Sequence, residues 1–330
     1  MSAAPKVVIT AKIDPVGPHN QIFKDNGFIE LHTPASCDPF IEDQLIELAR
    51  DCDAILAGSE TYSPRVIESL PKLRAIARAG VGFDAINLAS CDKARIPVCT
   101  TPGVNHHSVA EHTIGILMAI ARGFPLLDRK VRENRWYERR AYPRVMGKTI
   151  GLVGLGRIGQ ATAWRAAGLG LKVLAFEPFP NKEFVDKWNI ELVDLDTLLS
   201  RSDYVSLHCP MAKENYHLMN AARFARMKQG AMFVNTARGP LVDEKALYDA
   251  LKSGHIAAAG LDVFEEEPLP CTSPLLELEN VLVAPHVAGL DNESAHDTSK
   301  MCAEIIVGLH QGRWPEGCVQ NLKGVTGWTW

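Results

Sequence analysis

The chain has 330 residues, of which 46% are hydrophobic and 22% are charged. This composition is typical of a folded globular protein, and the length favours two domains rather than one. The formal net charge of −4 at pH 7 gives no reason to expect nucleic acid as a partner.

Cysteine use and the N-terminal segment favour a cytoplasmic protein. The eight cysteines form no C-x-x-C pair and no zinc-ligand spacing, so we expect buried thiols in a reducing compartment and no metal. The first ten residues, MSAAPKVVIT, lack the apolar region of a signal peptide. The longest apolar helix candidate, residues 109–121, contains Glu111 and His112 and is too short to span a membrane.

From Lys6 to Cys99, short apolar segments alternate with helical patterns. We expect strands at residues 6–10, 29–31, 54–56, 75–77 and 98–99. Helices are expected between them, for example at residues 41–50 and 64–70. Alternation of this kind predicts a parallel α/β sheet.

The most informative segment, residues 149–177, has the pattern of a strand, a glycine turn, a helix and a second strand. Gly154, Gly156 and Gly159 give the spacing G-x-G-x-x-G at the start of the helix. The first glycine permits a tight turn, the second lets the backbone approach a pyrophosphate, and the third lets the helix pack against the sheet. The free N–H groups at the helix N-terminus attract the same anion. The segment predicts a nucleotide-binding βαβ unit, and a glycine-rich turn without a ligand is the alternative.

Glu177 ends the second strand of this unit. A carboxylate there hydrogen-bonds the 2′-hydroxyl of an adenosine ribose and repels a 2′-phosphate. Pro178, Phe179 and Pro180 follow, so no basic residue stands directly after Glu177 to pair with a phosphate. We therefore expect NAD rather than NADP as the cofactor.

The series of strands and helices continues to the end of the chain. Strands are expected at residues 204–207, 231–234, 257–261 and 281–283, with helices at 195–200, 221–227 and 244–252. A helix at 108–122 precedes the βαβ unit and another at 299–310 follows the last strand, so we expect each to connect the domains. The sequence thus predicts an α/β protein with two Rossmann-like, doubly wound parallel-sheet domains and a cleft between them.

Three polar residues stand just after predicted strand ends, where ligands bind in open α/β sheets. Arg238 follows FVNTA, Glu267 follows GLDVFEE, and His286 follows VLVAP. Each alone has a structural explanation: a solvated loop arginine, a surface glutamate before proline, and a histidine that caps a turn. Together they supply a carboxylate clamp, a group that favours the imidazolium form, and a proton donor. The reduction of an oxoacid requires these three functions.

Seven segments in order carry a family resemblance: RAGVGFDAIN, TPGVNHHSVAEHTIGILMAIAR, GKTIGLVGLGRIG, LHCP, NTARGPLVDEKAL, GLDVFEEEP and APHVAG. By these segments the chain resembles the D-isomer-specific 2-hydroxyacid dehydrogenases, the family of phosphoglycerate, glyoxylate and hydroxypyruvate reductases. The resemblance covers nearly the whole chain. It implies an NAD-dependent oxidoreductase that interconverts a small 2-oxoacid and the D-2-hydroxyacid by hydride transfer.

The resemblance also implies a role for individual residues. His286 is the implied acid and base, Glu267 orients it, and Arg238 binds the substrate carboxylate. The backbone of Val81 and Gly82 is implied to bind the same carboxylate, and an ordinary glycine turn is the alternative for that loop. The implied cofactor contacts are Gly154, Gly156, Arg157, Ile158, Gly159, Glu177, Cys209, Pro210, Thr236, Ala237, Arg238, Asp262, His286 and Gly289. In the family the termini form the substrate domain, which implies residues 1–104 and 296–330 for the substrate and 105–295 for NAD.

A homodimer is a further expectation. The helix at 108–122 is apolar on more than one face, so it is expected to pack against more than its own sheet. Residues 135–144, which include Trp136 and Tyr137, resemble the arm that family members wrap around a partner subunit. A solvated basic loop is the alternative for this segment.

Departures from the family pattern narrow the substrate. Phosphoglycerate enzymes of the family carry an arginine after the strand that here reads AILAGSE, whereas this chain has Ala57, Gly58 and Ser59. Formate dehydrogenases carry glutamine in place of Glu267, and phosphite dehydrogenases carry lysine in place of Val81. We therefore expect a 2-oxoacid with an uncharged tail, such as glyoxylate or hydroxypyruvate. A 3-phosphoglycerate dehydrogenase and an NAD-sensing protein like the corepressors of this superfamily are the alternatives, although no regulatory domain or peptide-docking extension is expected.

Overall fold

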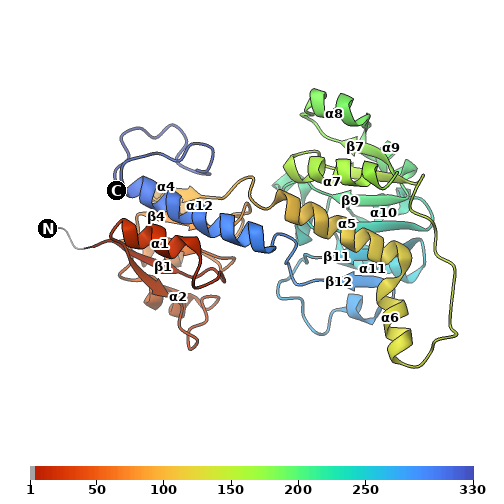
Figure 1. Ribbon diagram of the computed structural model, residues 1–330, viewed down its shortest axis with the longest axis horizontal. Coiled ribbons are helices and arrows are strands. Elements are labelled where there is room, and N and C mark those ends of the chain that lie inside the picture. Colours follow the sequence, from red (N-terminus) through yellow and green to blue (C-terminus); the bar gives the residue numbers. More distant parts are fainter. Residues whose placement is uncertain (1–3) are drawn as a thin grey trace. The chain divides into compact units, whose positions relative to one another are not determined.

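The computed structural model describes residues 4–330. The chain divides into two compact units, which we call unit 1 (Met1–Asn105 with Asp291–Trp330) and unit 2 (His106–Leu290). Each unit is built on one sheet whose paired strands are parallel, with helices packed on it (Figure 1). The predicted α/β class with two parallel sheets is confirmed.

Unit 1 has a five-stranded sheet in the order β2-β1-β3-β4-β5. Its strands are β1 (Lys6–Ile9), β2 (Ile29–His32), β3 (Ala54–Ala57), β4 (Ala75–Arg78) and β5 (Val98–Cys99). One face packs against α2 (Glu42–Ala49), α3 (Pro64–Glu68) and α4 (Leu88–Lys93). The other face packs against α1 (Pro18–Asp25) and α12 (Asn292–His310).

Unit 2 has a seven-stranded sheet in the order β12-β11-β10-β9-β6-β7-β8. Its strands are β6 (Thr149–Val153), β7 (Lys172–Phe176), β8 (Glu191–Leu192), β9 (Tyr204–Leu207), β10 (Ala231–Asn235), β11 (Ile256–Leu261) and β12 (Val281–Val283). One face packs against α5 (His106–Arg122) and α7 (Arg157–Gly168), and the other against α9 (Leu195–Arg201), α10 (Ala221–Arg226) and α11 (Glu244–Lys252). The remaining elements are α6 (Phe124–Arg132), α8 (Lys182–Trp188) and the 3₁₀ helices η1 (Lys213–Asn215), η2 (Gly239–Leu241) and η3 (Pro274–Glu277).

Helix caps explain where several of these helices begin. The side chain of Asp243 accepts a hydrogen bond from the Ala246 N–H at the start of α11. The Asp291 side chain does the same for Ser294 and so starts α12 seven residues before the predicted helix at 299–310. That prediction was wrong at its N-terminus because the aspartate cap is a stronger start signal than the later apolar residues.

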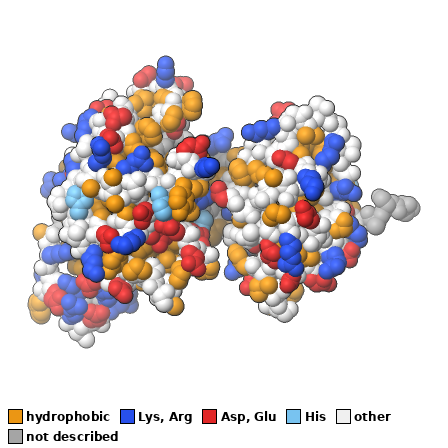
Figure 2. Space-filling view, turned by 180° about the vertical axis from the view of Figure 1, so that it is seen from behind, with side chains coloured by type: hydrophobic (Ala, Val, Ile, Leu, Met, Phe, Trp, Pro, Cys, Tyr) orange, Lys and Arg blue, Asp and Glu red, His pale blue; other side chains and the backbone are white. Residues whose placement is uncertain are grey.

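The surface carries charges of both signs. On the face drawn in Figure 2, Lys and Arg side chains are interspersed with Asp and Glu side chains over both units, in agreement with the small net charge. Among residues 4–330, no helix is both long enough and apolar enough to cross a membrane.

Candidate active site

The predicted site residues of unit 2 follow six strands that are neighbours in its sheet. In sheet order from β12 to β7, these strands are followed by His286, by Asp262 and Glu267, by Arg238, by Cys209 and Pro210, by Gly154, and by Glu177. Because the strands are parallel, their carboxyl ends lie at one edge of the sheet. The structure therefore gathers these residues at that edge, whereas Val81 and Gly82 follow β4 in unit 1.

The glycine turn after β6 has the geometry that its spacing predicts. Gly154 has a φ of +101°, a conformation that side chains disfavour. A Cβ atom on Gly159 would lie 2.3 Å from the Gly154 carbonyl oxygen, so α7 can approach the strand only with glycine there. Gly156 caps the N-terminus of α7, and no heavy atom lies within 4 Å of where its Cβ would be. The turn thus offers an open helix N-terminus, which suits a pyrophosphate.

Glu177 accepts two hydrogen bonds, one from this turn and one from its own loop. Its Oε2 atom accepts from the Leu155 N–H at 2.8 Å, and its Oε1 atom accepts from the Phe179 N–H at 3.0 Å. Leu155 lies between the first two glycines of the motif. The carboxylate therefore stands beside the glycine turn.

The loop after β10 holds Arg238. Asn235, which is 1% exposed, donates from Nδ2 to the Arg238 carbonyl at 2.9 Å and accepts at Oδ1 from the Ala237 N–H at 3.0 Å. A Cβ atom on Gly239 would lie 1.7 Å from the Phe264 carbonyl oxygen, so this loop presses against the loop that follows β11. Asn235 and Gly239 thus fix the backbone on both sides of Arg238.

Glu267 and His286 form a hydrogen-bonded pair. The distance from Glu267 Oε2 to His286 Nδ1 is 2.6 Å, and Glu267 Oε1 accepts from the Phe264 N–H at 2.9 Å. Burial by itself raises the pKa of Glu267, but the hydrogen bonds from His286 and Phe264 and the charges of His286 and Arg238 outweigh it, so the pKa is lowered. The His286 side chain is 40% exposed, which leaves its ring open to a ligand.

Asp262 holds the backbone around His286. Its fully buried carboxylate accepts from the Val287 N–H at 2.9 Å and from the Ala288 N–H at 2.8 Å, and its carbonyl accepts from the His286 N–H at 2.8 Å. His286 itself has a φ of +53°, a left-handed conformation that non-glycine residues rarely adopt. The sequence motif placed Asp262 among the cofactor contacts, but nothing in the motif indicated that it supports this strained loop.

The substrate loop predicted in unit 1 is held by Thr101. The Thr101 hydroxyl accepts from the Gly80 N–H at 2.9 Å, and the Thr101 N–H donates to the Gly80 carbonyl at 2.9 Å. Gly80 has a φ of +135°, and the half-buried residues Val81 and Gly82 follow it. No pattern in the sequence indicates this role of Thr101.

The chain is similar to known proteins of one enzyme family. The family model of the D-isomer specific 2-hydroxyacid dehydrogenase, NAD binding domain, matches residues 114–288. The chain is 40% identical to a glyoxylate reductase of Korarchaeum cryptofilum over 324 residues, which cover 96% of each protein. It is 41% identical over 273 residues to a D-3-phosphoglycerate dehydrogenase of Archaeoglobus fulgidus, covering 82% of this chain and 52% of that relative. Among solved structures, D-lactate dehydrogenase from Aquifex aeolicus, complexed with NAD and lactic acid, has a TM-score of 0.84 at 26% identity and covers 97% of this chain and 100% of that one.

Proposed function

Because the chain belongs to the D-isomer specific 2-hydroxyacid dehydrogenase family, we propose that it reduces a small 2-oxoacid to the D-2-hydroxyacid with His286 as the proton donor. The family and the enzyme class follow from the comparisons, and unit 2 contains the segment matched by the NAD-binding family model. The observation that carries the proposal is the 2.6 Å contact between His286 Nδ1 and Glu267 Oε2. This contact leaves Nε2 as the ring nitrogen that faces a substrate.

His286 and Glu267 act as a pair in the proposed reaction. When NADH is bound, its nicotinamide supplies the hydride that reduces the keto carbon. Negative charge then develops on the carbonyl oxygen, and His286 donates the proton from Nε2 to that oxygen. Glu267 holds the ring by accepting from Nδ1–H and stabilises the imidazolium before the proton leaves. In the oxidative direction His286 takes the proton back.

Arg238 and the loop of unit 1 bind the substrate in this proposal. The Arg238 guanidinium binds the substrate carboxylate with two parallel N–H donors, which a lysine cannot offer. The backbone N–H groups of Val81 and Gly82 donate to the same carboxylate. We accordingly propose residues 1–104 and 296–330 as the substrate domain and 105–295 as the NAD domain, with the cofactor held by the glycine turn, Glu177, and the residues from Thr236 to Arg238 and at Asp262.

We expect hydroxypyruvate to be reduced with a kcat/KM at least about tenfold above that of 3-phosphohydroxypyruvate. At the end of β3 a phosphate would meet an acidic side chain: the Gly58 N–H donates to the carboxylate of Glu60 at 3.0 Å, and Glu60 is 1% exposed. A phosphate placed there is desolvated beside a negative charge, which costs more than the 1.4 kcal/mol that corresponds to a tenfold change. Steady-state kinetics with NADH and a panel of 2-oxoacids measure the ratio.

The cluster of exposed arginines in the arm is the control for this prediction. Arg139→Ala and Arg140→Ala should leave the ratio unchanged, since neither side chain is proposed to bind substrate. If 3-phosphohydroxypyruvate has the higher kcat/KM and these variants abolish the advantage, the substrate assignment is wrong and the arm supplies the missing charge.

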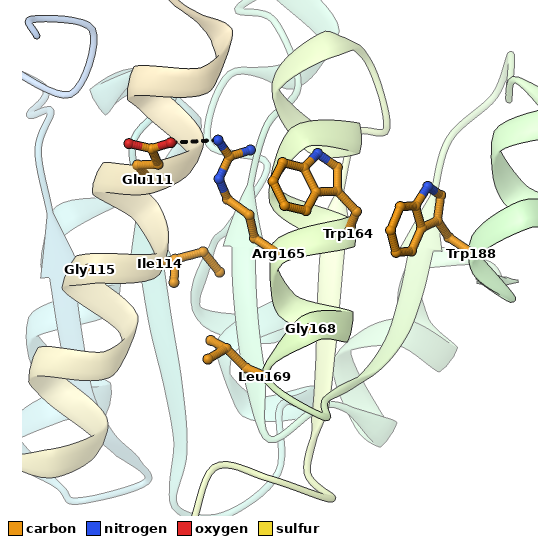
Figure 3. A pocket seen from close by; sticks show the side chains of 8 residues that line it. All are labelled: Glu111, Ile114, Gly115, Trp164, Arg165, Gly168, Leu169 and Trp188. Carbon is orange, nitrogen blue, oxygen red and sulfur yellow. Dashed lines mark hydrogen bonds and ion pairs between the residues drawn. The ribbon is translucent and has the colours of Figure 1, made fainter.

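A homodimer is the second part of the proposal. A pocket of about 560 Å³ lies on α5, α7 and α8 and contains none of the predicted site residues. Figure 3 shows Ile114 on α5, Trp164 on α7 and Leu169 directly after it, with Trp188 from α8 beyond them and an ion pair between Glu111 and Arg165. Residues 131–140 are all exposed, with Trp136 at 59% and Tyr137 at 89%. A second copy of the chain would cover the pocket and the exposed aromatic side chains of this segment.

Light scattering should therefore give a mass close to twice 36.2 kDa. Ile114→Glu places a charge in the proposed interface and should shift the protein toward the mass of one chain. Val16→Glu is the matched control, because Val16 is 85% exposed and lies in unit 1. A wild-type mass of one chain at micromolar concentration would contradict the dimer.

A further inference from the structure

The helix α5 directs three polar side chains at the loops that carry the proposed catalytic residues. We call Ser108, His112 and Thr113 the polar stripe of α5. They lie in unit 2, as do their partners, and the exposure of Ser108 is 6% and that of Thr113 is 0%. Buried polar groups on an otherwise apolar helix need partners, so the identity of those partners indicates what the stripe does.

Ser108 contacts the loop of His286 directly. Its hydroxyl donates to the Ala288 carbonyl at 2.8 Å, and the Ala288 N–H donates to Asp262 Oδ2 at 2.8 Å. The peptide groups on both sides of Ala288 are thus fixed, one by α5 and one by the end of β11. Ala288 lies two residues after His286, whose left-handed backbone needs such support.

His112 contacts the same support from the next helical turn. Its Nε2 atom is buried, forms no hydrogen bond within residues 4–330, and lies 3.5 Å from Asp262 Oδ1. Oδ1 also accepts from the Val287 N–H at 2.9 Å. The imidazole therefore faces the one carboxylate that holds both N–H groups following His286.

Thr113 reaches the loop of Arg238. Its hydroxyl bonds to the Val109 carbonyl within α5 and to the Thr236 hydroxyl, each at 2.8 Å. Thr236 lies two residues before Arg238. The polar stripe thus contacts the residues that hold the loops of both His286 and Arg238.

The helix that carries the stripe is seated tightly on the sheet. A Cβ atom on Gly260 would lie 2.0 Å from Ile116 Cγ2, so α5 and β11 approach as closely as glycine allows. Ile116, Leu117 and Ile120 are buried in the core cluster beneath the helix. Because α5 cannot shift without displacing this core, it provides a rigid reference for the loops.

We propose that Ser108, His112 and Thr113 are positioning residues for the hydride-transfer reaction, with His112 acting through Asp262 on His286. The inference rests on the proposed function, since it assigns these residues to the support of His286 and Arg238. Misplacement of a reacting group by a small distance lowers the rate of the chemical step while leaving the group present.

Single-turnover kinetics test the role of His112. Enzyme loaded with NADH is mixed with hydroxypyruvate, and the absorbance of NADH is followed. The amplitude reports the fraction of active enzyme, and the rate constant reports the chemical step in each active molecule. His112→Leu should lower the rate constant about tenfold or more. His112→Gln keeps a polar nitrogen near the position of Nε2 and should recover most of the loss. Ser108→Ala should also lower the rate constant, by a smaller factor.

His255→Leu is the matched control. His255 lies just before β11, at the opposite end from Asp262, and its two ring nitrogens contact Gln229 and the Phe224 carbonyl, each at 3.0 Å. The same substitution there should lower thermal stability and amplitude but leave the rate constant unchanged.

The outcomes distinguish a failure of the proposed function from a failure of the positioning role of His112. A wild-type protein that transfers no hydride to any 2-oxoacid would overturn the proposed function itself. An active wild type whose His112→Leu variant loses amplitude only, as the control does, would overturn the positioning role and leave the function standing. If the rate constant falls in His112→Leu and is not recovered in His112→Gln, the polar nitrogen that faces Asp262 does not sustain the rate. The proposed action of His112 through Asp262 would then be wrong.

Discussion

Replacing His286 by glutamine should lower kcat for the reduction of a 2-oxoacid by about 10²–10⁴-fold, the usual contribution of a positioned general acid. Glutamine can occupy the space of the imidazole, but its amide cannot donate a proton as an acid at neutral pH. In the proposed NADH site the glycine turn and Glu177 hold the cofactor by contacts that the substitution leaves in place, because His286 hydrogen-bonds Glu267 rather than either of them. Fluorescence titration should therefore give a dissociation constant for NADH close to that of wild type.

His296→Gln is the control for this loss. His296 is 60% exposed, pairs only with its neighbour Asp297 among the described residues, and lies in unit 1. The control should keep the kcat of wild type. Activity of His286→Gln within a few-fold of wild type would remove His286 from the mechanism, and a parallel loss of NADH binding would indicate damage to the unit rather than loss of a proton donor.

Cofactor choice should favour NADH over NADPH by about 100-fold or more in kcat/KM. A 2′-phosphate on the ribose would meet the Glu177 carboxylate, and unpaired like charges at a binding site cost several kcal/mol. Glu177→Ala should reduce the ratio to within about tenfold by removing that repulsion. Because Glu177 also accepts from the Leu155 N–H, the alanine variant should bind both cofactors less tightly, and only the ratio reports the repulsion.

Glu177→Gln refines this test. Glutamine removes the charge and keeps one acceptor for the glycine turn, so it should shrink the ratio with a smaller loss of NADH affinity than alanine causes. Glu183→Gln, on the exposed start of α8, is the control and should leave the ratio unchanged. An unchanged ratio in both Glu177 variants would mean that another group discriminates against the phosphate.

Much of the architecture could be predicted from the sequence because parallel strands leave a strong local pattern. Segments such as β3 and β9 are buried over their whole length and appear as short apolar runs. Helix starts were harder to predict, as α12 shows, because a single aspartate cap decides where the helix begins. The membership of the D-isomer specific 2-hydroxyacid dehydrogenase family, predicted from the series of motifs, is confirmed.

Only those site residues could be predicted whose chemical type and place after a strand suggest a function. Arginine, glutamate and histidine after strand ends are visible in a sequence, and the structure brings Glu267 and His286 into contact. The supports of the site were missed because their roles depend on tertiary contacts. Asn235 looks like an ordinary strand residue, and Ser108 looks like part of an apolar helix, until the loops they hold are in place. The left-handed backbone of His286 has no sequence signal at all.

Whether the protein reduces a 2-oxoacid to the D-2-hydroxyacid is decided by following the oxidation of NADH by the wild-type protein with hydroxypyruvate and determining the chirality of the glycerate formed. We expect turnover that is abolished by His286→Gln, with D-glycerate as the product. Tight NADH binding without turnover of hydroxypyruvate, glyoxylate or any other 2-oxoacid would contradict the account and would point to an NAD-sensing protein instead.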